Sequence, residues 1–97
     1  MIASGLSPST RVGRANVLST EISGRLVLMS EAKGTYVSLD PTGSQIWHHL
    51  EPARTVAELC DDLGGLYDVD PPLLERDVIT FLESLRIQGL VEIVAGA

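Results

Sequence analysis

Hydrophobic and polar residues alternate near the start of the chain with the period of two that is typical of a β-strand. Over residues 15–22, Leu18, Thr20 and Ile22 fall on one face. Ser23-Gly24 follows as a two-residue turn signal, because glycine adopts positive φ at no steric cost. We therefore expect a first strand that ends in a tight turn.

Two more strands are predicted directly after this turn. Residues 25–31 contain a run at 26–29 that is apolar on both faces, which is typical of a middle strand covered on both sides. Residues 32–34 form a second turn, and residues 35–39 return as a third strand. Three strands joined by tight turns predict an antiparallel meander in which the first and third strands are the edges.

From Asp40 onward the apolar spacing changes to that of α-helices. Asp40-Pro41 is a helix start, because aspartate caps free N–H groups and proline tolerates the first helical position; Glu51-Pro52 ends this helix. Thr55 and Glu58 form a capping box that begins a second helix, which Gly64-Gly65 ends. The apolar stripes are Ile46, Trp47 and Leu50 in the first helix and Val56, Leu59, Cys60 and Leu63 in the second.

A third helix begins at Asp70-Pro71 by the same cap and proline. It ends at Gly89, where Leu90 is placed to fold back as in a Schellman motif, and residues 90–94 are expected to add a short final strand. Its apolar stripe is Leu74, Val78, Phe81, Leu82 and Leu85. Three strands followed by three helices predict an α+β fold with the helices gathered on one face of the sheet.

Composition narrows the class of protein. The 97 residues are 44% hydrophobic, and this length predicts a single domain over residues 15–97, preceded by a flexible arm over residues 1–14, which is rich in Gly, Ser and Pro. The net charge of −6 disfavours nucleic acid as a partner. There is one cysteine, no signal-peptide pattern and no apolar run near the roughly 20 residues of a membrane span. We expect a soluble cytoplasmic protein that does not bind a membrane.

Few residues suggest chemistry. His48 and His49 are neighbours on a helix, where side chains one residue apart diverge by about 100° and do not easily share a metal. Cys60 lies on an apolar stripe and is expected to be a buried, inert thiol. The acidic pairs lack the spacing of a calcium loop, and no phosphate loop or nucleophile elbow is present. The sequence predicts no metal, no cofactor and no enzyme activity.

For two side chains, the sequence leaves two interpretations of their role open. Tyr36 lies on the expected edge strand, where its ring could contact a partner or fill the core. Asp77 lies at the margin of the third helix's apolar stripe, where it could accept a hydrogen bond from a ligand or face solvent. Trp47 and Phe81, on helical stripes, are expected to belong to the core.

Four ordered blocks resemble the PqqD-like family. They are residues 34–47, 55–59, 76–82 and 89–91, and with the strands before them they span residues 18–94. Family members are RiPP recognition elements, which bind the leader segment of a ribosomal precursor peptide. The resemblance implies a winged helix-turn-helix-like domain with a three-stranded antiparallel sheet followed by three helices. It also implies that the leader is bound as an added strand between the third strand and the third helix.

Within that family, the strand-to-helix segment at residues 38–47 is similar to the free-standing recognition protein of lasso-peptide pathways. There the domain works beside a separate leader peptidase and a cyclase. Residues 31–34 read Glu-Ala-Lys-Gly and lack the Pro-Glu-Gly turn of the quinone-cofactor branch. The implied role is non-catalytic delivery of a leader peptide. The implied peptide-binding residues are Thr35, Tyr36, Val37, Ser38 and Leu39 on the strand, with Leu74, Asp77, Val78 and Phe81 on the helix.

Three alternatives stay open at this point. One is a PqqD-type peptide chaperone for a radical-SAM enzyme. Another is a winged-helix DNA-binding regulator, although the third helix is net acidic and so disfavours phosphate contacts. The last is a small structural adaptor that only dimerises, because an unpaired strand edge also pairs with a second copy.

Overall fold

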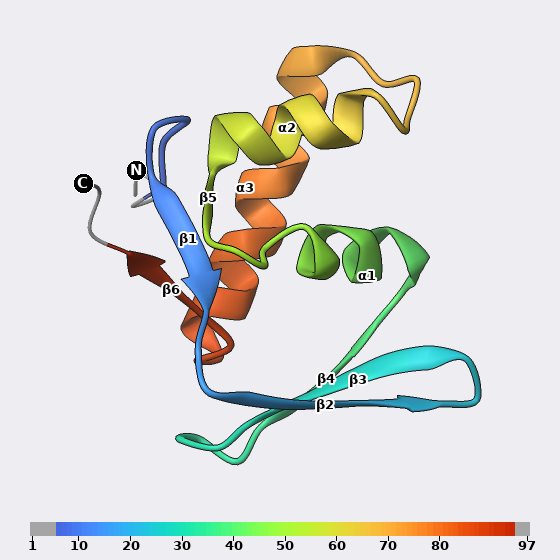
Figure 1. Ribbon diagram of the computed structural model, residues 1–97, viewed down its shortest axis with the longest axis vertical. Helices are drawn as coiled ribbons and strands as arrows, with labels where there is room; N and C mark the ends of the chain where they lie inside the picture. The colour runs from blue at the N-terminus through green and yellow to red at the C-terminus, as the bar shows by residue number, and fades with distance from the viewer. Residues whose placement is uncertain (1–5, 95–97) are drawn as a thin grey trace.

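The computed structural model describes residues 6–94, in which strands and helices follow one another in an α+β arrangement (Figure 1). The elements are β1 (Arg11–Arg14), β2 (Val17–Ile22), β3 (Arg25–Ser30), β4 (Tyr36–Leu39), α1 (Pro41–His48), β5 (Arg54–Thr55), α2 (Val56–Gly64), α3 (Pro71–Ile87) and β6 (Val91–Val94). The predicted α+β class with a three-stranded antiparallel sheet and three helices is confirmed, but a second sheet, which was not predicted, accompanies them.

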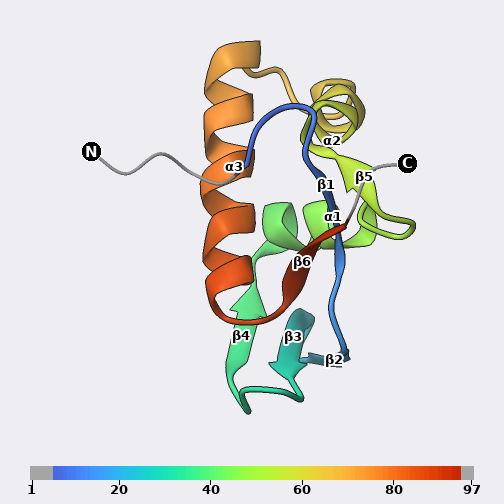
Figure 2. The same ribbon diagram turned by 90° about the vertical axis from the view of Figure 1, so that its left-hand side faces the viewer.

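The predicted meander forms the sheet β2-β3-β4 and is antiparallel throughout. Ser23 and Gly24, which join β2 to β3, have φ values of 54° and 80°. A two-residue hairpin whose two central residues both have positive φ matches the twist of the flanking strands. All three helices lie on one side of this sheet (Figures 1 and 2). That side is called the inner face below, and the opposite side the outer face.

The middle strand differs from its prediction. Leu26 and Leu28 of β3 are buried on the inner face, whereas Val27 and Met29 on the outer face are only half-buried. Leu18 and Ile22 of β2 share the outer face by register and are 53% and 57% exposed. The expectation that the run at 26–29 is covered on both sides is therefore wrong, because no helix of the described residues covers the outer face.

A second sheet has the strand order β5-β1-β6. The prediction of a flexible arm over residues 1–14 is therefore wrong for residues 11–14, which form β1. Residues 11–14 pair with β6, Arg11 and Val12 also pair with β5, and Val12 is 1% exposed. Gly13 explains how three short strands approach so closely, since a Cβ there would lie 3.0 Å from Val94 and 3.2 Å from Ala53. Strands of two to four residues show no alternation that sequence analysis can detect. Residues 1–5 lie outside the described part of the chain.

Arg14 connects β1 to the end of α1. Its Nε and Nη2 both donate to the carbonyl oxygen of Trp47, at 3.2 and 2.8 Å, and its guanidinium lies 4.7 Å from the centre of the Trp47 ring. Charge-assisted bonds to a carbonyl in the last turn of the helix and a cation–π contact both stabilise this arrangement. Arg14 therefore holds the second sheet against the helical layer.

The helix ends mostly follow the predicted capping. Asp40 Oδ1 accepts from the backbone N–H of Gly43 at 2.7 Å. Thr55 and Glu58 form the reciprocal capping box, and the hydrogen bond from the Thr55 backbone N–H lowers the pKa of Glu58. Asp70 is the exception, since its side chain makes no cap hydrogen bond to α3.

The C-terminus of α3 has the predicted Schellman motif. The backbone N–H of Leu90 donates to the Leu85 carbonyl at 2.9 Å, and that of Gly89 to the Arg86 carbonyl at 3.0 Å. Gly89 has a φ of 78°, a conformation that side chains disfavour. This tight stop turns the chain directly into β6.

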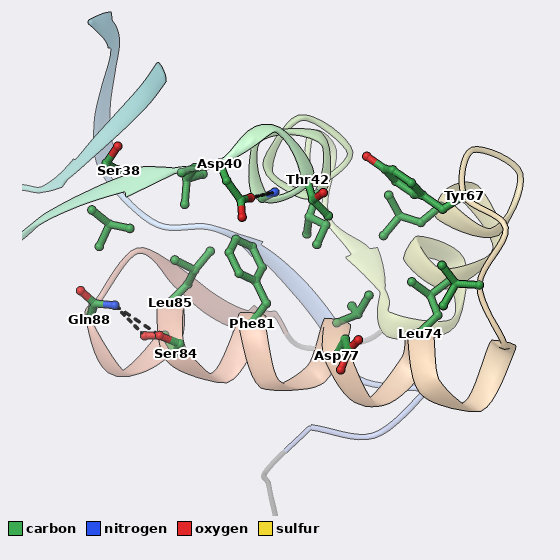
Figure 3. Close-up of a pocket in the computed structure, with 17 residues that line it drawn as sticks. Ser38, Asp40, Thr42, Tyr67, Leu74, Asp77, Phe81, Ser84, Leu85 and Gln88 are labelled. Carbon is green, nitrogen blue, oxygen red and sulfur yellow. Dashed lines mark hydrogen bonds between the residues drawn. The ribbon is translucent and has the colours of Figure 1, made fainter. Parts of the chain in front are cut away.

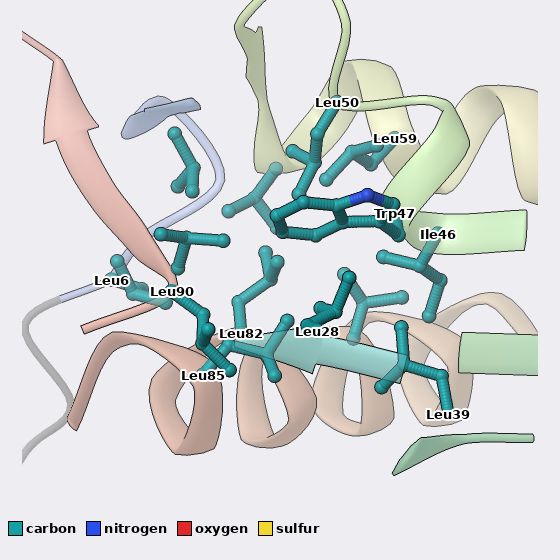
Figure 4. Close-up of a cluster of buried hydrophobic side chains, with 14 of the residues drawn as sticks. Leu6, Leu28, Leu39, Ile46, Trp47, Leu50, Leu59, Leu82, Leu85 and Leu90 are labelled. Carbon is teal, nitrogen blue, oxygen red and sulfur yellow. The ribbon is translucent and has the colours of Figure 1, made fainter. Parts of the chain in front are cut away.

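One continuous core joins the two sheets to the helices (Figure 4). Trp47 is 3% exposed and lies between Leu50 and Leu59 on one side and Leu28 and Leu82 on the other. The prediction that Trp47 belongs to the core is confirmed. Because α3 enters this core by Val78, Leu82 and Leu85, its position is determined by the helical layer.

We predict that Gly89→Ala lowers the free energy of unfolding by about 1–2 kcal/mol, because a Cβ at positive φ is strained. That Cβ would also lie 3.1 Å from Ser30 Oγ. Gly64→Ala is the matched control, since its added Cβ meets nothing within 4 Å. Urea denaturation followed by circular dichroism measures both. Equal stability of the two variants contradicts the structural role of Gly89.

Candidate functional site

A groove of about 420 Å³ runs between β4, α1 and α3 and continues towards α2 (Figure 3). Its lining is mostly apolar and comes from four elements and the loop after α2. The lining residues are Val37, Ser38, Leu39, Asp40, Thr42, Gly43, Ile46, Leu63, Tyr67, Val69, Leu74, Asp77, Val78, Phe81, Ser84, Leu85 and Gln88.

The open edge of β4 forms one rim of this groove. The Ser30 backbone N–H donates to the Thr35 carbonyl at 2.9 Å, so residues 35, 37 and 39 direct their backbone groups at β3 by antiparallel alternation. Tyr36 and Ser38 therefore direct their N–H and C=O groups outward. Among residues 6–94, no strand pairs with this edge. The side chains of Val37 and Leu39 lie on the inner face, towards the groove.

Phe81 lines the groove near its middle (Figure 3). In Figure 3 its ring stands on α3 and points towards the start of α1. Gly43 of α1 lies against it, since a Cβ on Gly43 would be 3.2 Å from the Phe81 ring. The prediction that Phe81 belongs to the core is only partly right, because its side chain is half-buried and lines the groove.

The two ends of the groove differ. Beside the start of β4, Thr35 Oγ1 donates to the Gln88 carbonyl at 3.2 Å, and Lys33 Nζ donates to the Ile87 carbonyl at 2.7 Å. A cation at a helix C-terminus is favourable, so these bonds hold the end of α3 near β4. The far end, between α1, α2 and α3, carries Leu63, Tyr67 and other apolar side chains and has no such bonds.

The charge of the lining is acidic. Asp40 and Asp77 are its only ionisable carboxylates, and no Lys, Arg or His is among the lining residues. Asp40 uses one oxygen to cap α1. Asp77 is 66% exposed and lies 4.0 Å from Arg76 Nε, a weak and solvent-screened pair. A ligand that places a donor or a cation beside Asp77 is therefore favoured over one that places an acid there.

Seven of the nine implied peptide-binding residues line the groove: Val37, Ser38, Leu39, Leu74, Asp77, Val78 and Phe81. The other two do not. Thr35 bonds to the end of α3, and Tyr36 is 70% exposed with its side chain on the outer face. Of the two interpretations of Tyr36, packing in the core is excluded.

Sequence analysis missed the contributions of α1, α2 and the loop after α2. Thr42 and Gly43 were interpreted only as part of a helix start, and Leu63 was assigned to the core alone, although all three line the groove. Tyr67 and Val69 carried no periodic signal, because they lie between helices. The approach of α2 to the groove follows from helix packing, which spacing along one element does not reveal.

Outside the groove, few of the described residues have side chains suited to metal binding or catalysis. No group of three His, Cys, Asp or Glu side chains within residues 6–94 is arranged to hold a metal ion. His48 is exposed and His49 is half-buried, with His49 Nδ1 2.8 Å from the Gln45 carbonyl oxygen. Burial raises the pKa of the Cys60 thiol, and the nearby carboxylates of Glu75 and Asp61 raise it further. No helix of the described part is long and apolar enough to cross a bilayer.

The family model described as "Coenzyme PQQ synthesis protein D (PqqD)" matches residues 25–91, well over half of the chain. The chain belongs to the PqqD family. The predicted resemblance to PqqD-like RiPP recognition elements is thereby confirmed. No curated protein matches this PqqD family member.

Solved structures share the fold. "TbiB1 in complex with the TbiA(beta) leader peptide" is 36% identical, with a TM-score of 0.76, and the match covers 87% of this chain and 99% of that one. The PqqD truncation of Methylobacterium extorquens PqqCD, a stand-alone RiPP recognition element, is 22% identical (TM-score 0.75; 92% and 96% covered). "Lasso peptide synthetase B1 complexed with the leader peptide" is also 22% identical (TM-score 0.73; 84% and 96% covered).

We predict that Cys60 reacts slowly with Ellman's reagent at pH 8. Its raised pKa leaves less thiolate, which is the reactive form. The rate in native protein should be several-fold below the rate in the same protein unfolded in urea. Equal rates contradict the assignment of Cys60 as an inert, partly buried thiol.

Proposed function

We propose that this protein binds the leader segment of a ribosomal precursor peptide without catalysing a reaction. The leader adds to the open edge of β4 as a further strand and places alternate side chains in the groove against α3. The observation that carries this proposal is the outward-facing backbone of Tyr36 and Ser38 beside an apolar groove. The family and the 36%-identical TbiB1, solved with a leader peptide, support it.

Affinity and specificity have separate sources in this proposal. The N–H and C=O groups of Tyr36 and Ser38 bond to any extended backbone, so they contribute affinity that is largely independent of sequence. Specificity comes from the side chains that face the groove, with Phe81 as the central anchor and Asp77 as the polar contact. Tyr36 contributes its backbone, since its ring lies on the other face.

The partner enzymes are the finer part of the proposal. We infer that the bound precursor is delivered to a leader peptidase and a cyclase of a lasso-peptide pathway, in the cytoplasm. The support is the lasso-type segment at residues 38–47 and the shared fold of the lasso peptide synthetase B1 that was solved with its leader peptide. A PqqD-type chaperone for a radical-SAM enzyme uses the same edge and groove. Reconstitution with the enzymes encoded beside this protein separates the two.

DNA binding is the weaker alternative. A winged helix-turn-helix-like placement of the β2–β3 hairpin and α3 is part of the proposed family resemblance and would suit a duplex. However, α3 carries Glu75, Asp77 and Glu83 against Arg76 and Arg86, and the groove adds no basic residue. Phosphate contacts require a basic surface, so the charge favours a peptide.

We predict that Ser38→Pro weakens leader binding at least tenfold in a protein that stays folded. Proline removes the outward N–H of Ser38, which β3 does not use, and proline is tolerated at a free strand edge. Calorimetry with the leader encoded beside this protein should show at least a tenfold loss, about 1.4 kcal/mol.

Ser38→Ala is the matched control, because it removes the hydroxyl that accepts from Arg25 Nε but keeps the backbone N–H. Its affinity should stay within a few-fold of the wild type. If both variants bind alike, strand addition at β4 is wrong.

We predict that Phe81→Ala weakens leader binding by about 2 kcal/mol, because a central, half-buried ring behaves as a hot spot. Leu73→Ala is the control on the same helix, since Leu73 is 40% exposed and does not line the groove. Fluorescence anisotropy with a labelled leader measures both variants. Unchanged affinity of a folded Phe81→Ala protein removes Phe81 from the site.

A further inference from the structure

We propose that the outer face of the β2-β3-β4 sheet is a self-association surface that pairs with a second copy of this chain. The face is opposite to the groove and carries an apolar row across all three strands. Leu18, Met29 and Tyr36 are directly paired in the register. Leu18 is 53% and Tyr36 70% exposed, and in Figure 1 no helix lies on this side of the sheet.

The charges at the two ends of this face are opposite. Along β3 and its continuation, residues on the outer face alternate as Arg25, Val27, Met29 and Glu31. Glu31 continues the pairing between β3 and the segment before β2, since its backbone N–H donates to the Asn16 carbonyl at 3.5 Å. Arg25 and Glu31 are both exposed, and neither forms an ion pair within residues 6–94. They lie six residues apart, about 20 Å in a strand.

This pattern is complementary to itself. When two outer faces stack about a two-fold axis with their β3 strands antiparallel, the axis passes at Leu28. Val27 then lies over Met29 of the second copy, and Arg25 over Glu31 of the second copy, with each pair formed twice. An isologous interface needs one surface that complements itself, and sheets stack at about 10 Å with nearly aligned strands. A different partner would have to supply this charge order independently.

The surface is small. Three strands about 4.8 Å apart and seven residues long make a face of roughly 14 by 23 Å, which is below the size of a stable interface. We therefore expect a weak, transient dimer. It leaves the groove open, because Val37 and Leu39 point to the inner face. The inference is therefore independent of peptide binding.

Analytical ultracentrifugation of the full chain from about 10 µM to about 1 mM tests the proposal. Wild type should shift from monomer to dimer with rising concentration. Arg25→Glu places acids at both ends of the face, and Glu31→Arg places bases at both ends, so each variant alone should stay monomeric. An equimolar mixture of the two should form a heterodimer at concentrations where neither self-associates. The double variant R25E/E31R should dimerise as wild type does.

Two controls complete the experiment. Glu92→Arg, on β6, makes the same change in net charge as Glu31→Arg outside the meander, and it should dimerise normally. The mixture reports on folding, because misfolded variants would not complement each other. A wild type that stays monomeric throughout overturns the proposal. A dimer that ignores the charge reversals also overturns it and indicates pairing through the open edge of β2.

Discussion

The site depends on how α3 is held apart from β4. Val78, Leu82 and Leu85 are buried among the residues of the helical layer, so the core determines where the axis of α3 lies. The next residues around the helix, including Phe81 and Asp77, then line a groove that no side chain of the described residues fills. At one end the bonds from Lys33 and Thr35 to the last carbonyls of α3 close this groove. Core packing and two polar contacts thus determine the shape of the groove.

The same arrangement explains why the edge of β4 stays free. The chain enters α1 directly at Asp40-Pro41, where the carboxylate caps the helix. No residues remain to form a hairpin that would cover Tyr36 and Ser38. An unpaired edge beside an apolar surface favours aggregation in most proteins. Here one short edge with a defined groove restricts what can pair with it, because the side chains of a bound strand must fit Phe81 and its neighbours.

The two faces of the meander have different surroundings. The inner face contributes Leu26, Leu28 and Leu39 to the core, while the outer face keeps Leu18 and Tyr36 exposed. A peptide strand added at β4 would become a fourth strand of the sheet that also carries the outer face. Binding on one face therefore need not exclude contact on the other.

Local signals in the sequence determined much of this structure. Alternation and turn residues predicted the meander and its edges, and the capping box at Thr55 and the stop at Gly89 predicted helix ends. Such features depend on residues within one turn or one hairpin. Seven groove residues were predicted because they lie on a strand and a helix that the family resemblance brings together. Only the tertiary structure revealed the strand at residues 11–14, the groove lining from Gly43 and Tyr67, and the uncovered outer face. These depend on the packing of segments distant in sequence, which neither periodicity nor local propensity encodes.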